Sequence, residues 1–393
     1  MRHAVAAAVL LTGYVFASPA PAPQLPDFNL VFDAPSPTAL GPPPVGIAQT
    51  SVFDSASAIS AATADVTTVV SAETTGSANL KRNYRGVNTA PTSAPAAIST
   101  SSSTTSAATT PASASAPSSP PCAPQPDGYG PANLTVEEFQ TDREFSNDAL
   151  NAPTPKGYVN TFKNLNASVN ANSYLGYYNL KSYDTNLCAQ HCDNTTLCTA
   201  FDIYVERDPS VDPTPGVCPN PDAITNYRCA LWGSGVEAAA AVNYGQYRDQ
   251  FQVVIAGSNG YEKTNTTTPA PCPGWTPPTS CPGAISGAPW NIGSNFFPGP
   301  FDPALCAAYA KQQTAYNKAH ADKGTGKYSP ANMFNAYMMK KNGIAQGTFC
   351  TLFTTILDGK FGSYPGGWVG NNFFGIETSF IYSLVNQDRG SIH

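Results

Sequence analysis

All ten cysteines of this 393-residue chain lie at or after Cys122, and so do all but six of its aromatic residues. Cysteines in this number favour disulfide bonds, which persist in oxidising compartments. We therefore expect a secreted, extracellular or cell-wall-associated protein whose folded part is confined to residues 122–393. The formal net charge of −6 argues against a nucleic-acid ligand, because phosphate binding needs clustered basic residues.

The first 121 residues predict targeting and processing. Residues 1–17 combine a short polar start with an apolar run, which is typical of a signal peptide cleaved after Ala17. Residues 18–82 are rich in Ala, Ser, Thr and Pro, which predicts a disordered pro-segment. They end in Lys81-Arg82, which resembles a kexin-type cleavage site; the alternative is a chance pair. Residues 83–121 predict an extended, O-glycosylated linker.

The rest of the sequence predicts exposed glycans and no membrane anchor. No later stretch is apolar enough for a membrane span or a GPI signal. Sequons of the form Asn-x-Ser/Thr mark surface loops, because a bulky glycan needs solvent. They predict N-glycosylation at Asn133, Asn166, Asn194 and Asn265.

The cysteine-containing region holds an internal repeat. Asp-x-x-Leu-Cys-Ala occurs at 184–189 and at 302–307, and Phe-x-x-Tyr at 201–204 and 334–337. Cys-x-Leu followed by an aromatic residue occurs at 229–232 and 350–353, and Gly-x-aromatic at 245–247 and 366–368. Four matches in the same order indicate a duplication.

Local signals predict the same structure in both copies. Asp184 and Asp302 are good helix N-caps, and Pro303 is tolerated at a first helical position. Short β-type runs follow each helix, at 200–205, 229–232 and 251–256 in the first copy and at 349–356 and 379–384 in the second. We predict an α+β fold of two tandem disulfide-stapled units, each with one helix across a small antiparallel sheet. The units cover 122–263 and 297–386, with a linker at 264–296, behind the disordered N-terminal arm.

The repeat also suggests which cysteines pair. The second copy keeps counterparts of Cys188 and Cys229, but it has Ala310 where the first has Cys192 and no counterpart of Cys198. Residues that are absent together are most simply partners. The repeat therefore predicts Cys188–Cys229, Cys306–Cys350 and Cys192–Cys198, proximity suggests Cys272–Cys281, and Cys122 and Cys218 remain as a fifth pair.

The pattern Cys-x3-Cys-x5-Cys-x2-Phe at 188–201, followed by Arg-Cys-Ala-Leu-Trp at 228–232, resembles the PAN/apple domain. The resemblance implies a helix stapled to a curled antiparallel sheet, and binding of proteins or carbohydrates without catalysis. It also implies the helix-to-strand disulfide. Segments 198–209, 245–248, 253–261 and 299–303 look like a group of fungal secreted proteins of unknown function, over roughly 122–385. The second copy departs from the pattern, because it lacks the local disulfide and carries an insertion between Cys306 and Phe334.

We predict a non-catalytic adhesion or recognition protein of a fungal cell surface or wall. Its partner would be an extracellular protein or a wall glycan, without cofactor or metal, and the sequence leaves the oligomeric state open. The candidate ligand contacts are Trp232, Tyr247 and Trp368; the alternative is that these rings fill the core.

Two other functions stay open. One is a carbohydrate-active enzyme, for which paired carboxylates are needed and Asp202, Glu206 and Asp208 are the candidates. The other is a structural wall glycoprotein. The sequence Ala-Gly-Ser-Asn-Gly at 256–260 lacks the first glycine of a nucleophile elbow, which favours a turn there.

Overall fold

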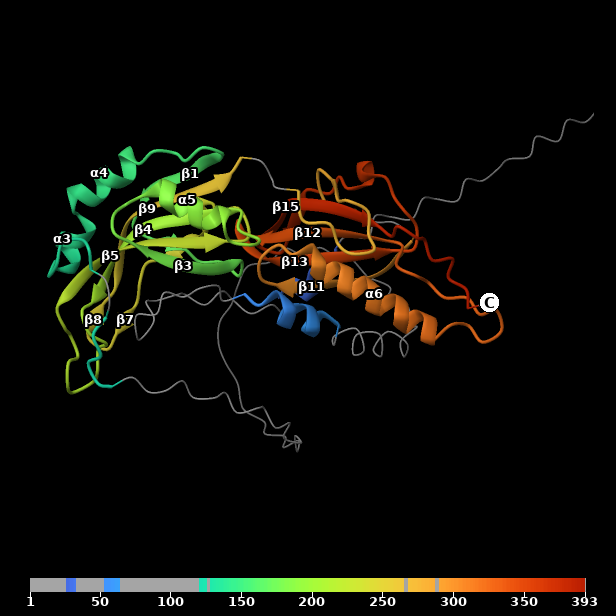
Figure 1. Ribbon diagram of the computed structural model, residues 1–393, viewed down its shortest axis with the longest axis horizontal. Coiled ribbons are helices and arrows are strands. Elements are labelled where there is room, and N and C mark those ends of the chain that lie inside the picture. Colours follow the sequence, from blue (N-terminus) through green and yellow to red (C-terminus); the bar gives the residue numbers. More distant parts are fainter. Residues whose placement is uncertain are drawn as a thin grey trace, which may run out of the picture.

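The computed structural model describes residues 26–32, 53–63, 120–125, 128–264, 268–286 and 290–392. Two antiparallel sheets form its body, one carried mainly by the green and yellow strands of Figure 1 and one by the orange and red strands. The predicted cleavage sites at Ala17 and Lys81-Arg82, and the sequon at Asn265, lie outside the described residues.

The first sheet has five strands in the order β1-β9-β4-β5-β3. Helix α5 (Thr185–Asp193) connects β3 to β4 and packs against β4 and β5. The carboxylate of Asp184 accepts the Leu187 N–H, which confirms the predicted N-cap. The strands are β1 (Tyr158–Leu165), β3 (Tyr174–Leu180), β4 (Ala200–Pro209), β5 (Ala223–Trp232) and β9 (Val254–Lys263).

The second sheet has the same plan, in the order β10-β15-β12-β13-β11. Helix α6 (Pro303–Ala319) connects β11 to β12, and the Asp302 carboxylate caps it by accepting the Ala304 N–H, again as predicted. A sixth strand, β14 (Gly366–Val369), pairs only with β15. The other strands are β10 (Thr279–Ser280), β11 (Asn291–Pro298), β12 (Met333–Lys341), β13 (Ile344–Phe353) and β15 (Asn372–Ser383).

Smaller elements complete the two halves. Helices α3 (Val136–Gln140) and α4 (Arg143–Asn151) pack on β9 through Phe139 and Phe145, which join a cluster with Val254. Two short ladders pair β2 (Ser168–Val169) with β6 (Ala241–Asn243) and β7 (Tyr247–Arg248) with β8 (Phe251–Gln252). The 3-10 turns η1 (Ala238–Ala240) and η2 (Gly359–Phe361) follow Cys229 and Cys350 at the same spacing.

The two halves share one hydrophobic core. Along β5, Cys229 and Leu231 face α5, whereas Trp232 points to the opposite side of the sheet. That side joins a single buried cluster with Leu305 of α6 and Phe334 of β12. Polar contacts also cross the boundary: Lys340 Nζ forms an ion pair with Glu237 Oε1 at 2.7 Å, and the Gly235 N–H donates to Glu377 Oε1 at 2.6 Å.

These observations correct the predicted fold. The described residues form mostly antiparallel β-structure in four sheets with few helices. The prediction of two units, each with one helix on a small sheet, is therefore wrong. The predicted linker 264–296 instead supplies two strands of the second sheet, β10 and most of β11. These strands are short or begin near the end of the segment, and their pairing partners, β15 and β13, lie far away in the sequence.

The predicted disorder of the N-terminal arm is wrong for two segments. Helix α1 (Asn29–Phe32) buries Val31 in a cluster with Phe374, and the preceding Phe28 packs on the same ring. A second helix, at 55–63, packs on the shared core and buries its Ala62 completely. Ser55 Oγ also donates a 2.8 Å hydrogen bond to Asp302 Oδ2 at the start of α6.

Four disulfides are present, which agrees with a protein that folds in an oxidising compartment. The predicted pair Cys272–Cys281 is wrong: both thiols are free and buried, Cys272 in the shared core and Cys281 in a separate cluster around Phe353. The bonded pairs are Cys122–Cys218, Cys188–Cys229, Cys192–Cys198 and Cys306–Cys350.

Candidate functional site

In each half, a ribbon of two paired strands carries a strongly exposed aromatic ring: β7–β8 in the first half and β14–β15 in the second. Tyr247 on β7 is 69% exposed and lies opposite Gln252, whereas Trp368 on β14 is 72% exposed and lies opposite Phe373. The two rings follow Cys229 and Cys350 at the same distance along the chain. Tyr and Trp combine an apolar body with a polar group, which suits them to contact surfaces.

A glycine two residues before each ring lets the ribbon approach the sheet closely. Gly245 and Gly366 have φ values of 95° and 122°, which favour glycine. A Cβ atom at Gly245 would lie 2.1 Å from the carbonyl oxygen of Val253, and one at Gly366 would lie 2.1 Å from that of Phe374. The sheet backbone therefore holds both ribbons in the same way, and the exposed rings project from a fixed base.

Trp368 packs on a second ring, and amide side chains lie beside that second ring. Its neighbour Phe373 is 38% exposed, and the two ring centroids lie 5.4 Å apart in an edge-to-face arrangement. Beside Phe373, Asn342 Nδ2 donates to Asn372 Oδ1 at 2.8 Å, and the Asn342 side chain also accepts the Phe373 N–H. A flat apolar face next to amide groups can meet a ligand that has both apolar and hydroxyl surfaces.

The Tyr247 ring is also fixed from its polar end. Its hydroxyl donates to Gln252 Oε1 across the β7–β8 ladder at 3.1 Å, so the ring has a preferred orientation although it is exposed. Tyr244, which lies between β6 and β7, is 67% exposed. The first half thus presents an aromatic surface of its own, less hydrophobic than that around Trp368.

Trp232 is not a surface residue, contrary to the prediction for it as a ligand contact. It is 1% exposed and packs edge-to-face on Tyr174 in the shared core. Cross-strand alternation put it on the face of β5 away from α5, and the second half covers that face. The structure therefore separates the three predicted contacts into two exposed rings and one core ring.

The three candidate carboxylates of the enzyme alternative are buried and occupied. Glu206 Oε2 accepts from Arg228 Nε at 2.7 Å, and Asp208 Oδ2 accepts from Arg228 Nη2. Asp202 accepts from the Val169 N–H and from Ser258 Oγ. None of the three is more than 2% exposed, so they do not form the open pair that a glycosidase needs.

Burial changes the protonation of these acids. It raises the pKa of Asp202 to about 7, although its two hydrogen bonds oppose the change. Burial and the neighbouring charge of Asp208 raise the pKa of Glu206, while Arg228 acts in the opposite direction. Ser258 itself lies in strand β9, so the predicted turn at 256–260 is wrong.

We expect the raised pKa of Asp202 to make folding more favourable in acid. The folded-state value of about 7 lies above the ordinary 3.8, so this contribution is complete below about pH 4 and is lost as the pH rises through 7. The slope from this group reaches at most about 1.4 kcal/mol per pH unit. Urea unfolding at pH 4, 5.5 and 7 measures it. Asp202→Asn keeps a polar amide there and should flatten the profile; an unchanged slope would contradict the assignment.

Three of the predicted glycan acceptors lie on the surface. Asn133, Asn166 and Asn194 are exposed, so each is accessible to glycosylation. Among the helices that the structure describes, none is long and apolar enough to cross a membrane. Within the same residues, no group of three or more His, Cys, Asp or Glu side chains could hold a metal ion.

Comparison with known proteins leaves the function to be argued from this geometry. The resemblance to the PAN/apple domain rests on the cysteine pattern alone, and no relative identifies such a domain. The chain matches no protein-family model, no curated protein and no solved structure.

Proposed function

We propose that this protein is a secreted, non-catalytic recognition protein that binds a glycan of the cell surface or wall through Tyr247 and Trp368. The observation that carries the proposal is the equivalent placement of two exposed rings on two ribbons of the same design. A protein partner is the other outcome that the test below can return.

The chemistry of the Trp368 surface favours a sugar over a purely apolar partner. The faces of a pyranose ring carry C–H groups that pack on an aromatic ring, while its hydroxyls need donors and acceptors at the edge. Trp368 and Phe373 offer the aromatic surface, and Asn342 and Asn372 offer amide groups next to it.

Two sites on one chain suit a repeating polymer. When a first ring surface is bound, the second meets the same polymer at a raised effective concentration, and overall affinity exceeds that of either site. We therefore expect tight binding to a long polysaccharide and weak binding to a short oligosaccharide.

The test is a glycan array and pull-down with the secreted protein, followed by titration with soluble β-glucan and chitin oligomers. Trp368→Ala should weaken binding about tenfold on the short oligomers and more on the polymer, because it removes one of two contacts. Tyr247→Ala should act in the same direction. Neither change should lower the melting temperature, since both side chains are exposed.

Tyr129→Ala is the matched control, because it removes a half-exposed ring from a loop outside both ribbons and should leave binding unchanged. Glycan binding that survives in the double variant Tyr247→Ala, Trp368→Ala would refute the proposal. If the protein instead captures another protein in a Trp368-dependent way and binds no glycan, the function is recognition of a protein partner.

A further inference from the structure

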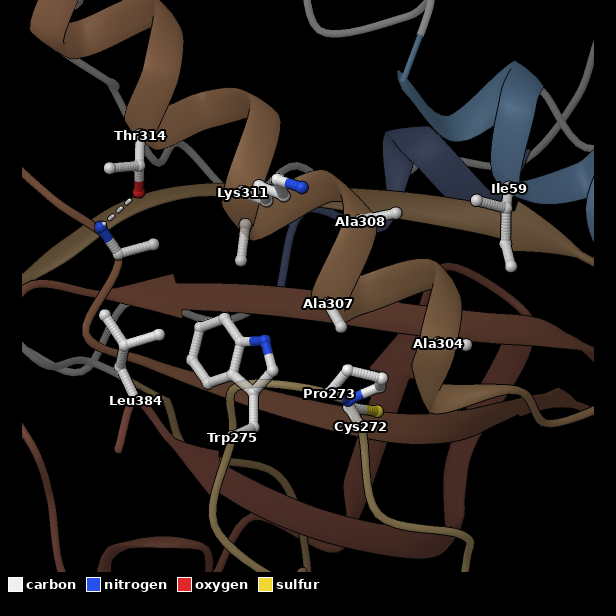
Figure 2. Close-up of a pocket in the computed structure, with 12 residues that line it drawn as sticks. Ile59, Cys272, Pro273, Trp275, Ala304, Ala307, Ala308, Lys311, Thr314 and Leu384 are labelled. Carbon is white, nitrogen blue, oxygen red and sulfur yellow. Dashed lines mark hydrogen bonds between the residues drawn. The ribbon is translucent and has the colours of Figure 1, made fainter. Parts of the chain in front are cut away.

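A separate apolar cavity of about 520 Å³ lies beside α6, as Figure 2 shows. Four alanines of α6 form one wall, and Trp275 and Leu384 form another. Ile59, from the helix at 55–63, closes part of the rim. Ligand cavities in proteins have volumes of roughly 300–1,000 Å³, so this one is large enough for a small organic molecule.

The small side chains of α6 create this space. Where a core helix would present Leu or Ile, the sequence supplies Ala304, Ala307 and Ala308 toward the cavity. Trp275 fits the opposite side and is held edge-to-face against Phe334, with ring centroids 4.6 Å apart. The cavity walls are therefore rigid elements rather than loops alone.

The polar atoms of the cavity are hydrogen-bond donors. Trp275 is 8% exposed, and its indole N–H has no acceptor among the described residues; in Figure 2 the nitrogen lies on the side of the ring toward Cys272 and Ala307. Lys311 lines the cavity, is exposed, and forms no ion pair with any residue that the structure describes. The Thr314 hydroxyl oxygen accepts the Ala331 N–H at 2.9 Å.

The charges near the cavity orient a ligand. Burial, and secondarily the charge of Asp302, raises the pKa of Cys272 to about 11, so this thiol stays protonated and is a weak donor. The carboxylate of Asp302 accepts from Ser55 and Ala304 at the start of α6. An anionic group is therefore disfavoured near Asp302 and favoured about two and a half helical turns further along α6, at Lys311.

We propose that this cavity binds an apolar monocarboxylic acid, with its hydrocarbon part between α6 and Trp275 and its carboxylate at Lys311. Such a ligand fills an apolar space with its hydrocarbon part and supplies a counter-ion for Lys311 with its carboxylate. The site is independent of the ribbons that carry Tyr247 and Trp368.

Isothermal titration of the secreted protein with dodecanoate and hexadecanoate, and with the matching alcohols, tests this. The acids should bind at least tenfold more tightly than the alcohols. Lys311→Gln should remove that preference, and Trp275→Phe should weaken the acids severalfold while keeping a ring against Phe334. Ala307→Leu fills the cavity and should abolish binding of both classes.

Lys318→Gln is the matched control, because this lysine lies two turns further along α6, outside the cavity, and its loss should change nothing. The glycan titrations should be unaffected by Ala307→Leu, so failure here is distinguishable from failure of the proposed function. Equal affinity for acids and alcohols, no binding of either, or an equal effect of Lys311→Gln and Lys318→Gln would overturn the proposal.

Discussion

Replacing Arg228 by methionine is expected to lower the free energy of unfolding by about 3–5 kcal/mol, because it leaves two buried carboxylates without their counter-ion. Arg228 is 4% exposed and bonds Glu206 and Asp208. Its guanidinium also lies over the Tyr177 ring, 4.8 Å from the centroid. Urea or thermal unfolding of purified protein measures the loss.

Neutralising the acids separates charge from packing. The triple variant Arg228→Met, Glu206→Gln, Asp208→Asn removes all three charges and should recover most of the stability lost by the single variant. Lys360→Met is the control, because Lys360 and Asp358 form an exposed pair at 4.0 Å whose loss should cost less than about 1 kcal/mol. A triple variant as unstable as Arg228→Met would show that lost packing, not unpaired charge, causes the effect.

Removing the Cys306–Cys350 disulfide by a double alanine substitution should lower the free energy of unfolding by about 4 kcal/mol. The bond ties α6 to β13 and closes a loop of sequence separation 44, so the unfolded chain gains much entropy when it is cut. Equilibrium unfolding in urea gives the difference.

The short loop of Cys192–Cys198, with separation 6, provides the comparison within the same chain. Its removal should cost about 2 kcal/mol in the chain-entropy model. Cys272→Ala controls for deletion of a buried sulfur without a bond. Equal losses for the two disulfides would mean that native-state contacts, rather than loop closure, determine their contribution.

Signals confined to a few residues were predictable from the sequence. Asp184 and Asp302 cap their helices because each carboxylate accepts a free backbone N–H of the first helical turn. This interaction depends only on residues next to each other in the sequence. Two further local signals in the sequence also predict structure. Thr135 and Glu138 form the capping box that begins α3, and Asn342-Gly343 is the two-residue turn between β12 and β13.

Features that depend on distant parts of the chain were not predictable. Trp232 looked like a possible surface ring because its strand has one face against α5, and nothing local indicates that the other face is covered by residues a hundred positions later. The buried Ala62 has the same explanation, since its helix is stabilised by α6 rather than by its own sequence. Cys272 and Cys281 are close in sequence, yet they enter different clusters.

Of the site itself, the sequence identified Tyr247 and Trp368 through the repeat, but not their exposure. The decisive contact is between a glycine and a carbonyl of the next strand, which depends on the register of β14 with β15. The cavity beside α6 was not anticipated, because an alanine-rich helix face reads equally well as close packing.

The buried cluster that joins Trp232 and Tyr204 to Leu305 and Phe334 has an evolutionary consequence. A gene segment that ended between the two sheets would encode only one half of this cluster. The apolar side chains that the other half covers would then be exposed to water. We therefore expect neither half to serve as a portable module in another protein, and substitutions along this seam to be tolerated best in matched sets across both halves.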